Sequence, residues 1–399
     1  LPLPLPLSLP LPLPLPLPPS LSSPLPTYTR RMALAAMPSP CGTALFSTVV
    51  GGALLAGSFL LARRRRSHRF ADDSSALEVS SLFIHPVKSC APLCLDAAML
   101  DKLGFVDDRR LMIVSAEPYD GNHAFLTQRQ RPRMCLIQCQ LRGDEMQLLA
   151  PDRQPLTVPL KPPASGLLLR VRVWSDSGLT AVDLGEAAAT WLSDFLETSV
   201  RLVSAAHPSW KRSLDRRYLP WDLRWAWGGP QVGFADGFPL LLASTSSLDE
   251  LNRRLAPGDP LPMNRFRPNI VVSGSEPFDE DTWRRIRIGD ATFRVVKGCS
   301  RCKITTTDQA TANQGTRIGA DGVTAEPLAT LARFRAVGPE VYFATNLVHE
   351  WPPPLFERVL RWLRGQPMSP SVSVGDRVQV LQRGEPIWDE EAVRAASKA

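Results

Sequence analysis

Hydrophobic and polar residues alternate in many short segments of the chain after residue 76. Alternation at period two places successive side chains on opposite faces of a β-strand, so each such segment is predicted to form a half-buried strand. The apolar stretch 291–296 is also interpreted as a strand. The clearest alternating segments are 77–84, 111–114, 167–174, 285–288 and 377–381.

Helical periodicity occurs in only a few places. Residues 187–197 carry apolar side chains on one helical face, residues 247–255 begin with the capping-box pattern Ser-Leu-Asp-Glu, and residues 327–335 form a third predicted helix. Many strands and few helices favour a mainly β fold of the α+β class over a doubly wound sheet. We therefore predict two domains of the β-barrel type.

The beginning of the chain has a different composition. Residues 1–43, in which Leu and Pro alternate as far as residue 26, are predicted to be disordered, and Met32 is a reasonable translation start. The apolar segment 44–62 has 19 residues, enough to cross a hydrocarbon core of roughly 30 Å as a helix. Arg63 to Arg66 follow this segment, the order expected of a retained membrane anchor with the rest of the chain in the cytosol. The alternative is a buried helix of a soluble domain.

The rest of the chain divides into five parts by pattern. Residues 63–76 form a basic linker, 77–205 a first β-barrel domain, 206–232 a connecting segment, 233–385 a second barrel domain and 386–399 a tail. The connecting segment has no clear periodicity. We expect it to join the two halves and to lie across the mouth of a site.

The positive charge of the chain is concentrated near the apolar segment. The formal net charge is +7, but seven arginines and no acidic residue precede Phe70, so the remaining chain carries 39 basic and 39 acidic residues. A protein that binds the phosphate backbone needs a basic face on its folded part. We therefore expect no nucleic-acid partner.

Seven cysteines, an odd number in a chain with room for a large core, predict no disulfide framework. Cys135 and Cys139 lie on a predicted strand and are interpreted as small buried residues. No cysteine follows Cys302, so no four-cysteine iron–sulfur cluster is expected after it. No Gly-x-Gly-x-x-Gly sequence follows a strand, so no dinucleotide site is predicted.

Cys302 is the strongest candidate for chemistry. It stands after the strand 291–296, in the sequence Cys-Ser-Arg-Cys-Lys-Ile-Thr-Thr, beside cations and hydroxyls. Thiolate binds soft metals, and neighbouring positive charge favours the thiolate form. The same Cys-x-x-Cys pattern also occurs as half a zinc site, as a redox pair or as two buried residues.

Three ordered motifs resemble the MOSC-domain family over about residues 78–385. They are Ile-His-Pro-Val-Lys-Ser-Cys from Ile84, Asn-Arg-Phe-Arg-Pro-Asn from Asn264 and Cys-Ser-Arg-Cys from Cys299. Together with the apolar segment 44–62, they resemble most closely the amidoxime-reducing members of that family. The resemblance implies an N-terminal β-barrel domain followed by a MOSC domain that carries a molybdenum ligand.

The resemblance also implies a molybdopterin cofactor and its protein contacts. Cys302 matches the cysteine that binds molybdenum and takes part in catalysis, whereas Cys299 is expected to be a packing residue. Arg109 matches an arginine that reaches the cofactor, although Arg110 could replace it. Some relatives have a tyrosine that contacts the cofactor where this chain reads Phe-Ala-Thr-Asn from Phe343, and Asn346 can form a hydrogen bond in its place. The other implied cofactor contacts are Lys88, Ser89, Arg267, Asn269, Ser300 and Arg301.

The activity implied by the resemblance is reduction of N-hydroxylated compounds, such as amidoximes and hydroxylamines, to amidines or amines. The implied electron donors are cytochrome b5 and its NADH-dependent reductase. The implied location is the mitochondrial outer membrane, with one membrane-spanning helix and the catalytic part facing the cytosol.

Two other functions are compatible with the sequence. A molybdenum-cofactor carrier or sulfur-transfer protein would share the fold, although no pyridoxal-phosphate domain accompanies it here. A membrane adaptor could bind zinc through two cysteine pairs, Cys90 with Cys94 and Cys299 with Cys302.

Overall fold

The computed structural model of the protein describes residues 77–224, 229–255, 258–319, 321–352, 355–363, 365 and 368–397. The predicted disordered segment 1–43, anchor 44–62 and linker 63–76 lie outside these ranges. No helix within the ranges is long and apolar enough to cross a membrane. The described part is mainly β, and its helices are α2 (Glu186–Leu196), α3 (Trp221–Arg224), α4 (Thr245–Arg254), α5 (Leu328–Phe334), α6 (Leu355–Leu363) and α7 (Glu390–Ala396).

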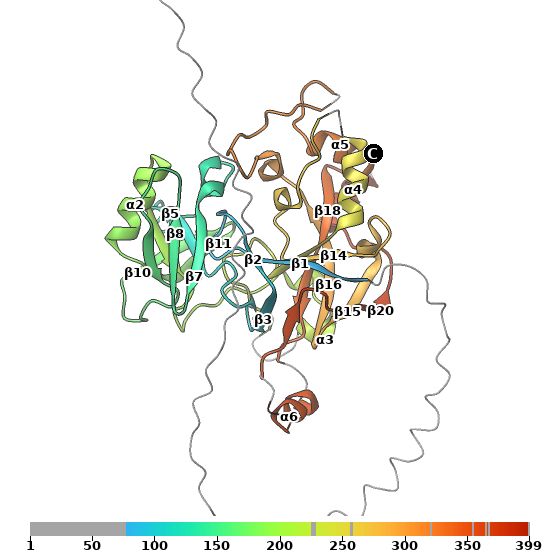
Figure 1. The fold of residues 1–399 in the computed structure, drawn as a ribbon, viewed down its shortest axis with the longest axis horizontal. Coiled ribbons are helices and arrows are strands. Elements are labelled where there is room, and N and C mark those ends of the chain that lie inside the picture. Colours follow the sequence, from blue (N-terminus) through green and yellow to red (C-terminus); the bar gives the residue numbers. More distant parts are fainter. Residues whose placement is uncertain are drawn as a thin grey trace, which may run out of the picture.

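The largest sheet has nine strands and contains strands from both ends of the described chain (Figure 1). Its order is β2-β1-β14-β13-β18-β16-β15-β20, and β17 pairs with β18. Only β13 and β14 run parallel among the neighbours in this sheet. The strands are β1 (Glu78–Ile84), β2 (Leu93–Leu95), β13 (Leu240–Ser244), β14 (Ile270–Ser273), β15 (Trp283–Ile288), β16 (Ala291–Ser300), β17 (Ala336–Val337), β18 (Glu340–His349) and β20 (Val378–Arg383).

Three smaller sheets complete the β structure. A five-stranded sheet has the order β5-β12-β11-β10-β6, and two three-stranded sheets have the orders β19-β3-β4 and β7-β8-β9. Their bounds are β3 (Ala97–Asp101), β4 (Gly104–Phe105), β5 (Leu111–Ser115), β6 (His123–Ala124), β7 (Gln138–Arg142), β8 (Glu145–Leu149), β9 (Leu156–Pro159), β10 (Leu168–Val173), β11 (Asp176–Asp183), β12 (Val200–Ser204) and β19 (Ser371–Ser373).

The first strand of the described chain belongs to the sheet of the second half. β1 pairs with β14 in a register that places Glu78 opposite Ser273 and Leu82 opposite Ile270. Figure 1 shows β1 among the later strands, whereas the strands and helix between residues 111 and 204 form a separate body beside them. The two halves are therefore interleaved rather than joined end to end.

The expectation of two β-barrels is wrong for the described strands. Closure into a barrel requires every strand to be hydrogen-bonded on both sides, but the nine-stranded order ends at β2 and β20. An isolated bridge between Glu78 and Arg377 brings the start of β1 beside the start of β20, without continuing as a ladder. The described sheets therefore remain open.

Most predicted elements are confirmed. The alternating segments correspond to β1, β5, β10, β15 and β20, the stretch 291–296 belongs to β16, and the three predicted helices correspond to α2, α4 and α5. The strand predicted around Cys135 is wrong, because residues Pro132–Leu136 form a 3₁₀ helix and β7 begins only at Gln138. Both Cys135 and Cys139 are buried, as predicted.

The predicted capping box of α4 is also wrong. The helix begins at Thr245, so Ser247 lies inside it. The Ser247 hydroxyl donates to the buried Glu280 carboxyl group instead, at 2.8 and 2.9 Å from its two oxygens. The hydrogen bond to Glu280 thus replaces the capping hydrogen bond that the local pattern predicted for Ser247.

Apolar cores pack against both faces of the nine-stranded sheet. One face packs in a core that includes Leu82, Trp283 and Phe293. The other face packs against α4 and α5 through residues such as Leu251 and Leu331. The smaller body has its own core around α2 and β5, so each half is stabilised by buried apolar surface of its own.

Candidate functional site

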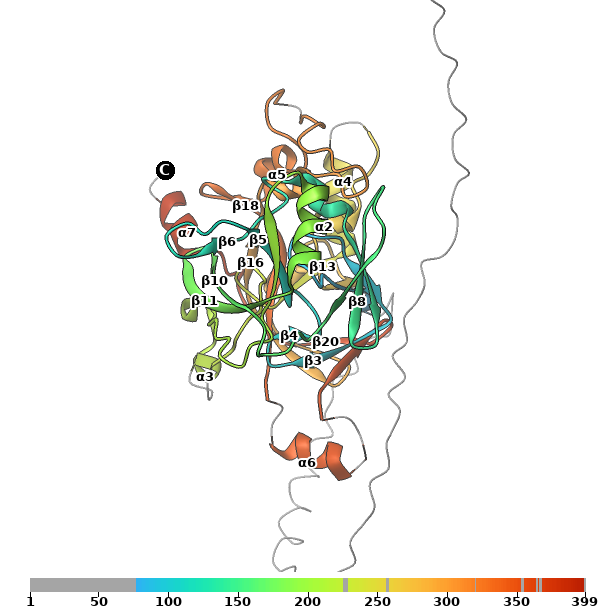
Figure 2. The same cartoon turned by 90° about the vertical axis from the view of Figure 1, so that its left-hand side faces the viewer.

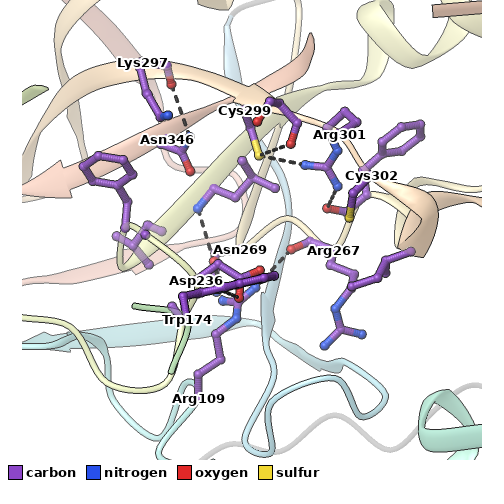
Figure 3. A pocket seen from close by; sticks show the side chains of 18 of the residues that line it. Arg109, Trp174, Asp236, Arg267, Asn269, Lys297, Cys299, Arg301, Cys302 and Asn346 are labelled. Atoms are coloured by element: carbon purple, nitrogen blue, oxygen red, sulfur yellow. Dashed lines mark hydrogen bonds between the residues drawn. The ribbon is translucent and has the colours of Figure 1, made fainter. Parts of the chain in front are cut away.

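A cavity of about 420 Å³ lies where loops from the two halves meet (Figure 3). The first half contributes the loop after β1, Arg109 before β5, Arg129 after β6 and the turn between β10 and β11. The second half contributes the loops before β13 and β14 and the end of β16. The nine site residues predicted from the sequence all line this cavity: Lys88, Ser89, Arg109, Arg267, Asn269, Ser300, Arg301, Cys302 and Asn346.

Cys302 lies two residues after the end of β16, at the N-cap position of the 3₁₀ helix Lys303–Thr306. Its sulfur accepts a hydrogen bond of 3.1 Å from Nη2 of Arg129. The Arg129 guanidinium also stacks on the Trp174 ring, with its carbon 4.6 Å from the ring centroid. The arginine thus places a fixed positive charge at the sulfur, which compensates the negative charge of a thiolate ligand.

Lys88 is buried beside the cavity and faces Asp236. Its Nζ donates to the Phe234 carbonyl at 2.7 Å and to the Asp236 carboxylate. Burial lowers the pKa of Lys88 to about 8, although the attraction of Asp236 opposes this shift. For Asp236, desolvation acts to raise the pKa, but Lys88, Trp174 and Arg129 together outweigh it and hold that pKa well below its usual range. The Trp174 indole donates a further hydrogen bond of 2.9 Å to Asp236.

Arg109 and Asn269 form the floor of the cavity. Arg109 donates to the carboxylate of Asp108 at 2.7 Å and to Oδ1 of Asn269 at 2.9 Å. Asn269 is fully buried, and its amide donates to the Phe83 carbonyl of β1 at 3.1 Å. Arg110 does not line the cavity and instead pairs with Asp101 at 2.6 Å. Of the two arginines left open by the sequence, Arg109 therefore faces the site.

Arg267 carries a buried nitrogen without a protein partner. Its Nη1 donates to the Cys90 carbonyl at 2.7 Å, whereas Nη2 is inaccessible to solvent and has no hydrogen-bond partner. Burial, followed by repulsion from Arg109, lowers the pKa of Arg267 to about 10. Because Nη2 is closed off from solvent, a ligand in the open cavity does not reach it, and Arg267 lines the cavity through other atoms.

Several cavity residues have strained backbone conformations. Ser89, Arg109, Trp174 and Arg267 have φ values of 68°, 48°, 56° and 57°, in the left-handed region that favours glycine. Such conformations cost free energy and persist where the surrounding structure holds them, often at functional sites. Here they accompany side chains that line the cavity.

Arg301 links Cys299 to the loop before β14. Its Nη1 donates to the Cys299 sulfur at 3.0 Å, and Nη2 donates to the Phe266 carbonyl at 2.9 Å. Cys299 also packs against the apolar core beneath the sheet. Ser300, the last residue of β16, pairs with Tyr342 in the β-ladder.

A polar cluster supports the far side of the cavity. Asp389 accepts from Lys297, from the Tyr218 hydroxyl at 3.2 Å and from the Tyr342 hydroxyl at 3.1 Å. Asn346 donates to the Lys297 carbonyl at 3.4 Å. The predicted tail and connecting segments both take part, because Asp389 belongs to the first and Tyr218 to the second.

Sequence reasoning missed Arg129, Trp174, Asp236 and Lys297, all of which line the cavity. Arg129 stands in the polar run Gln-Arg-Gln-Arg, and Trp174 ends an alternating strand, so neither has a local signal of a site. Asp236 follows Gly-Phe-Ala in a loop. Only its pairing with Lys88, 148 positions away, reveals its part in the site.

The zinc site formed by two cysteine pairs is wrong. Cys90 is fully buried and packs with Cys139 in the core of the smaller body, whereas Cys94 is exposed on β2. Within the described ranges, no group of three or more His, Cys, Asp or Glu side chains is placed to hold a metal ion. A cysteine that shares a metal with a non-protein ligand remains compatible with this geometry.

Comparison with known proteins gives two family matches and a set of relatives. The MOSC N-terminal beta barrel domain family matches residues 76–199, and the MOSC domain family matches residues 229–379. The chain is 33% identical to mitochondrial amidoxime-reducing component 1 of Mus musculus, over 75% of this chain and 84% of that protein. It is 32% identical to component 2 of Rattus norvegicus, over 76% of this chain and 85% of that protein.

A solved solution structure of a protein from Bordetella bronchiseptica also resembles part of the chain. The match covers 28% of this chain and 94% of that one, with 20% identity and a TM-score of 0.21. A score this low does not establish a common fold.

Proposed function

This chain belongs to the MOSC-domain family of the mitochondrial amidoxime-reducing components, and we propose that it is a molybdenum-cofactor oxidoreductase that reduces N-hydroxylated compounds. The observation that carries the proposal is the meeting of Cys302 with the cationic side chains of Lys88 and Arg109 in one cavity. A soft ligand and an anion-binding donor are the two protein groups that a metal dithiolene with a phosphate requires.

The residues present fit such a cofactor. Lys88 uses two of its three N–H donors within the protein, which leaves one for an anionic group of the ligand, and Arg267 lines the same cavity. Arg109 and Asn269 would hold polar ring atoms near the floor. Ser89, Ser300, Arg301 and Asn346 line the remaining wall, and Cys302 would bind the metal.

When bound, a molybdenum cofactor supplies a metal centre that exchanges two electrons and an oxygen atom. The protein residues would position the reaction. Arg129 holds positive charge at the Cys302 sulfur, and its stacking on Trp174 fixes its orientation. The Asp236 carboxylate beside the cavity favours cationic groups, and amidines, the products of amidoxime reduction, are cations at neutral pH.

Membrane attachment and electron supply complete the proposal. The apolar segment 44–62 would anchor the chain, and the names of the relatives favour a mitochondrial membrane, which we take to be the outer one with the catalytic part facing the cytosol. The sequence shows no dinucleotide-binding motif, so electrons would come from partners. We propose cytochrome b5 and its NADH-dependent reductase for that part.

Elemental analysis and reduction assays test the proposal together. The purified full chain should contain one molybdenum per chain and should reduce a benzamidoxime-type substrate when NADH, cytochrome b5 and its reductase are all added. NADH alone should give no turnover. Zinc in place of molybdenum would overturn the proposal. Molybdenum without reduction of any N-hydroxylated substrate, with an artificial donor as well, would instead indicate a cofactor carrier.

A further inference from the structure

Helix α6 exposes large apolar side chains to solvent. Phe356, Trp362 and Leu363 are 72%, 73% and 65% exposed, and Val359 is 45% exposed. Figures 1 and 2 show the helix projecting from the body of the molecule in two perpendicular views. Contiguous exposed apolar surface of this kind marks an interaction site in a folded protein.

The apolar residues lie on one face of the helix. Phe356, Val359 and Leu363 follow at spacings of three and four, and Trp362, three residues after Val359, widens the same face. A surface helix ordinarily turns this face to the protein core and its polar face to water. In α6 the arrangement is reversed.

The polar side of α6 is the side attached to the protein. Arg361 is buried and donates to the Asp290 carboxylate at 2.6 Å and to the Asp290 carbonyl at 3.1 Å. Asp290 also accepts from the backbone N–H of Ser371, at the start of β19, at 2.8 Å. These bonds hold the helix with its apolar face outward, so the exposure is built into the fold.

The helix emerges at the end of the molecule where the described chain begins. The Leu77 carbonyl accepts from the backbone N–H of Val378, and Val79 exchanges backbone hydrogen bonds with Gly375 and Asp376. The Asp376 side chain accepts from the Ser373 N–H in β19, the same strand that contacts Asp290. The entry of the chain into the body and the base of α6 therefore share one turn region.

We propose that α6 lies on the surface of the membrane in which the apolar segment 44–62 is inserted. This inference rests on the membrane attachment proposed above. Residues 63–76, fourteen in number, can span at most roughly 50 Å when fully extended, so an anchor would hold this end of the body close to the bilayer.

The chemistry of the helix fits a lipid surface. Trp and Phe side chains are favoured at the membrane–water interface, and a short helix with one apolar face lies in the headgroup region. Arg358 is exposed beside the apolar face and can contact anionic headgroups. The contact would fix the orientation of the cavity relative to the membrane.

Photocrosslinking in vesicles tests the inference. The full chain is inserted into phosphatidylcholine vesicles that contain a smaller fraction of phosphatidylserine, with benzoylphenylalanine in place of Trp362. A matched chain carries it in place of Tyr119, an aromatic residue that is 78% exposed on the other half. We expect lipid adducts on the order of tenfold more abundant at position 362, because an inserted side chain contacts lipid continuously. Benzoylphenylalanine in place of Phe356 should give the same excess.

Anchoring is measured separately on the same vesicles, by the fraction of chain that remains after alkaline carbonate extraction. If the chain stays in the vesicles but lipid adducts are equally abundant at positions 362 and 119, the contact of α6 with lipid is contradicted while the anchor is not. Adducts of position 362 with a second protein chain, or with residues 44–62, would do the same. Chain that is released from the vesicles would overturn the membrane attachment on which the inference rests.

Discussion

The guanidinium of Arg129 donates a hydrogen bond to the sulfur of Cys302 across 173 positions of sequence. The two residues come from different halves of the chain, and Trp174 holds the arginine from the side of the first half. The thiol is thus placed by the second half, while its electrostatic environment is set by the first. A functional cavity therefore requires both halves to be correctly packed.

Arg129→Gln should weaken metal retention at Cys302. The substitution removes the charge that compensates a thiolate, and a hydrogen bond to a charged group contributes about 1.5–3 kcal/mol, equivalent to roughly 10- to 100-fold in affinity. Molybdenum per chain, measured after dialysis, should fall accordingly. Arg131→Gln is the control, because the Arg131 side chain is exposed and donates to the carbonyl of the neighbouring Gln130 at 3.2 Å. Equal loss in both variants would contradict the assignment.

Cys302→Ser should abolish N-reduction, because a neutral hydroxyl is a hard and weak replacement for thiolate. Cys299→Ser should keep substantial activity, since a serine oxygen can still accept the hydrogen bond from Arg301 that the Cys299 sulfur accepts at 3.0 Å. The rate of amidoxime reduction with an artificial donor separates the two variants. The reverse order of activities would assign the metal to Cys299.

Arg109→Gln and Arg110→Gln form a matched pair. Arg109 lines the cavity, so its loss should lower the bound pterin by roughly 10-fold or more, measured by fluorescence after release from the protein. Arg110 pairs with the partly exposed Asp101, so its loss should leave pterin content unchanged and cost about 1 kcal/mol of unfolding free energy at most. Equal pterin loss in the two variants would contradict a direct role of Arg109 in binding the cofactor.

Cofactor binding should weaken as the pH rises through about 8. Burial lowers the pKa of Lys88 to about 8, so the folded protein loses this positive charge at a pH where an unfolded chain would still hold it. The apparent affinity of the empty protein for the phosphorylated pterin should therefore fall between pH 7 and pH 9, by up to about 10-fold. Lys88→Arg should remove this part of the pH dependence. If Lys88→Arg keeps the same pH dependence of pterin affinity, a group other than Lys88 must cause it.

Glu280→Gln should stabilise the protein at high pH. Burial, followed by repulsion from Asp281, raises the pKa of Glu280 to about 7, so the folded state holds this proton more tightly than the unfolded chain does. The resulting stability is present at acidic pH and lost as the pH rises through 7. At pH 8 the variant should gain about 2–3 kcal/mol in urea unfolding, with little gain near pH 4.5.

The control for Glu280 is Glu276→Gln, which changes an exposed carboxylate in the same loop. This variant should leave the unfolding free energy at pH 8 within experimental error. A similar gain in both variants would show that a general reduction of negative charge, rather than the buried position of Glu280, stabilises the protein.

Local periodicity predicted several of the strands but not their partners. The alternation in 77–84 predicts a half-buried strand, which the structure confirms as β1. Its partner β14 begins at Ile270, and no local pattern encodes that pairing. The domain division at 205 and 233 follows composition along the chain, so it could not reveal that β1 and β2 extend the sheet of the second half.

The site followed the same rule. Residues in motifs, such as Lys88 and Cys302, were found because their neighbours in sequence define them. Arg129 and Asp236 were missed because each gains its part in the site from a contact more than 140 positions away. The prediction for Ser247 was wrong for the same reason: its local sequence resembles a helix cap, but its hydroxyl bonds to the distant Glu280.

The place of β1 in the large sheet has a consequence for biosynthesis. Ser80 in β1 bonds to Val271, 191 positions later, so the first strand leaves the ribosome long before its partner exists. At about 5–20 residues per second, this delay lasts roughly 10–40 s. During that time an unpaired apolar strand follows closely behind the apolar segment 44–62. Prompt insertion of that segment, or capture of β1 by a chaperone, would then decide how much of the nascent chain escapes aggregation.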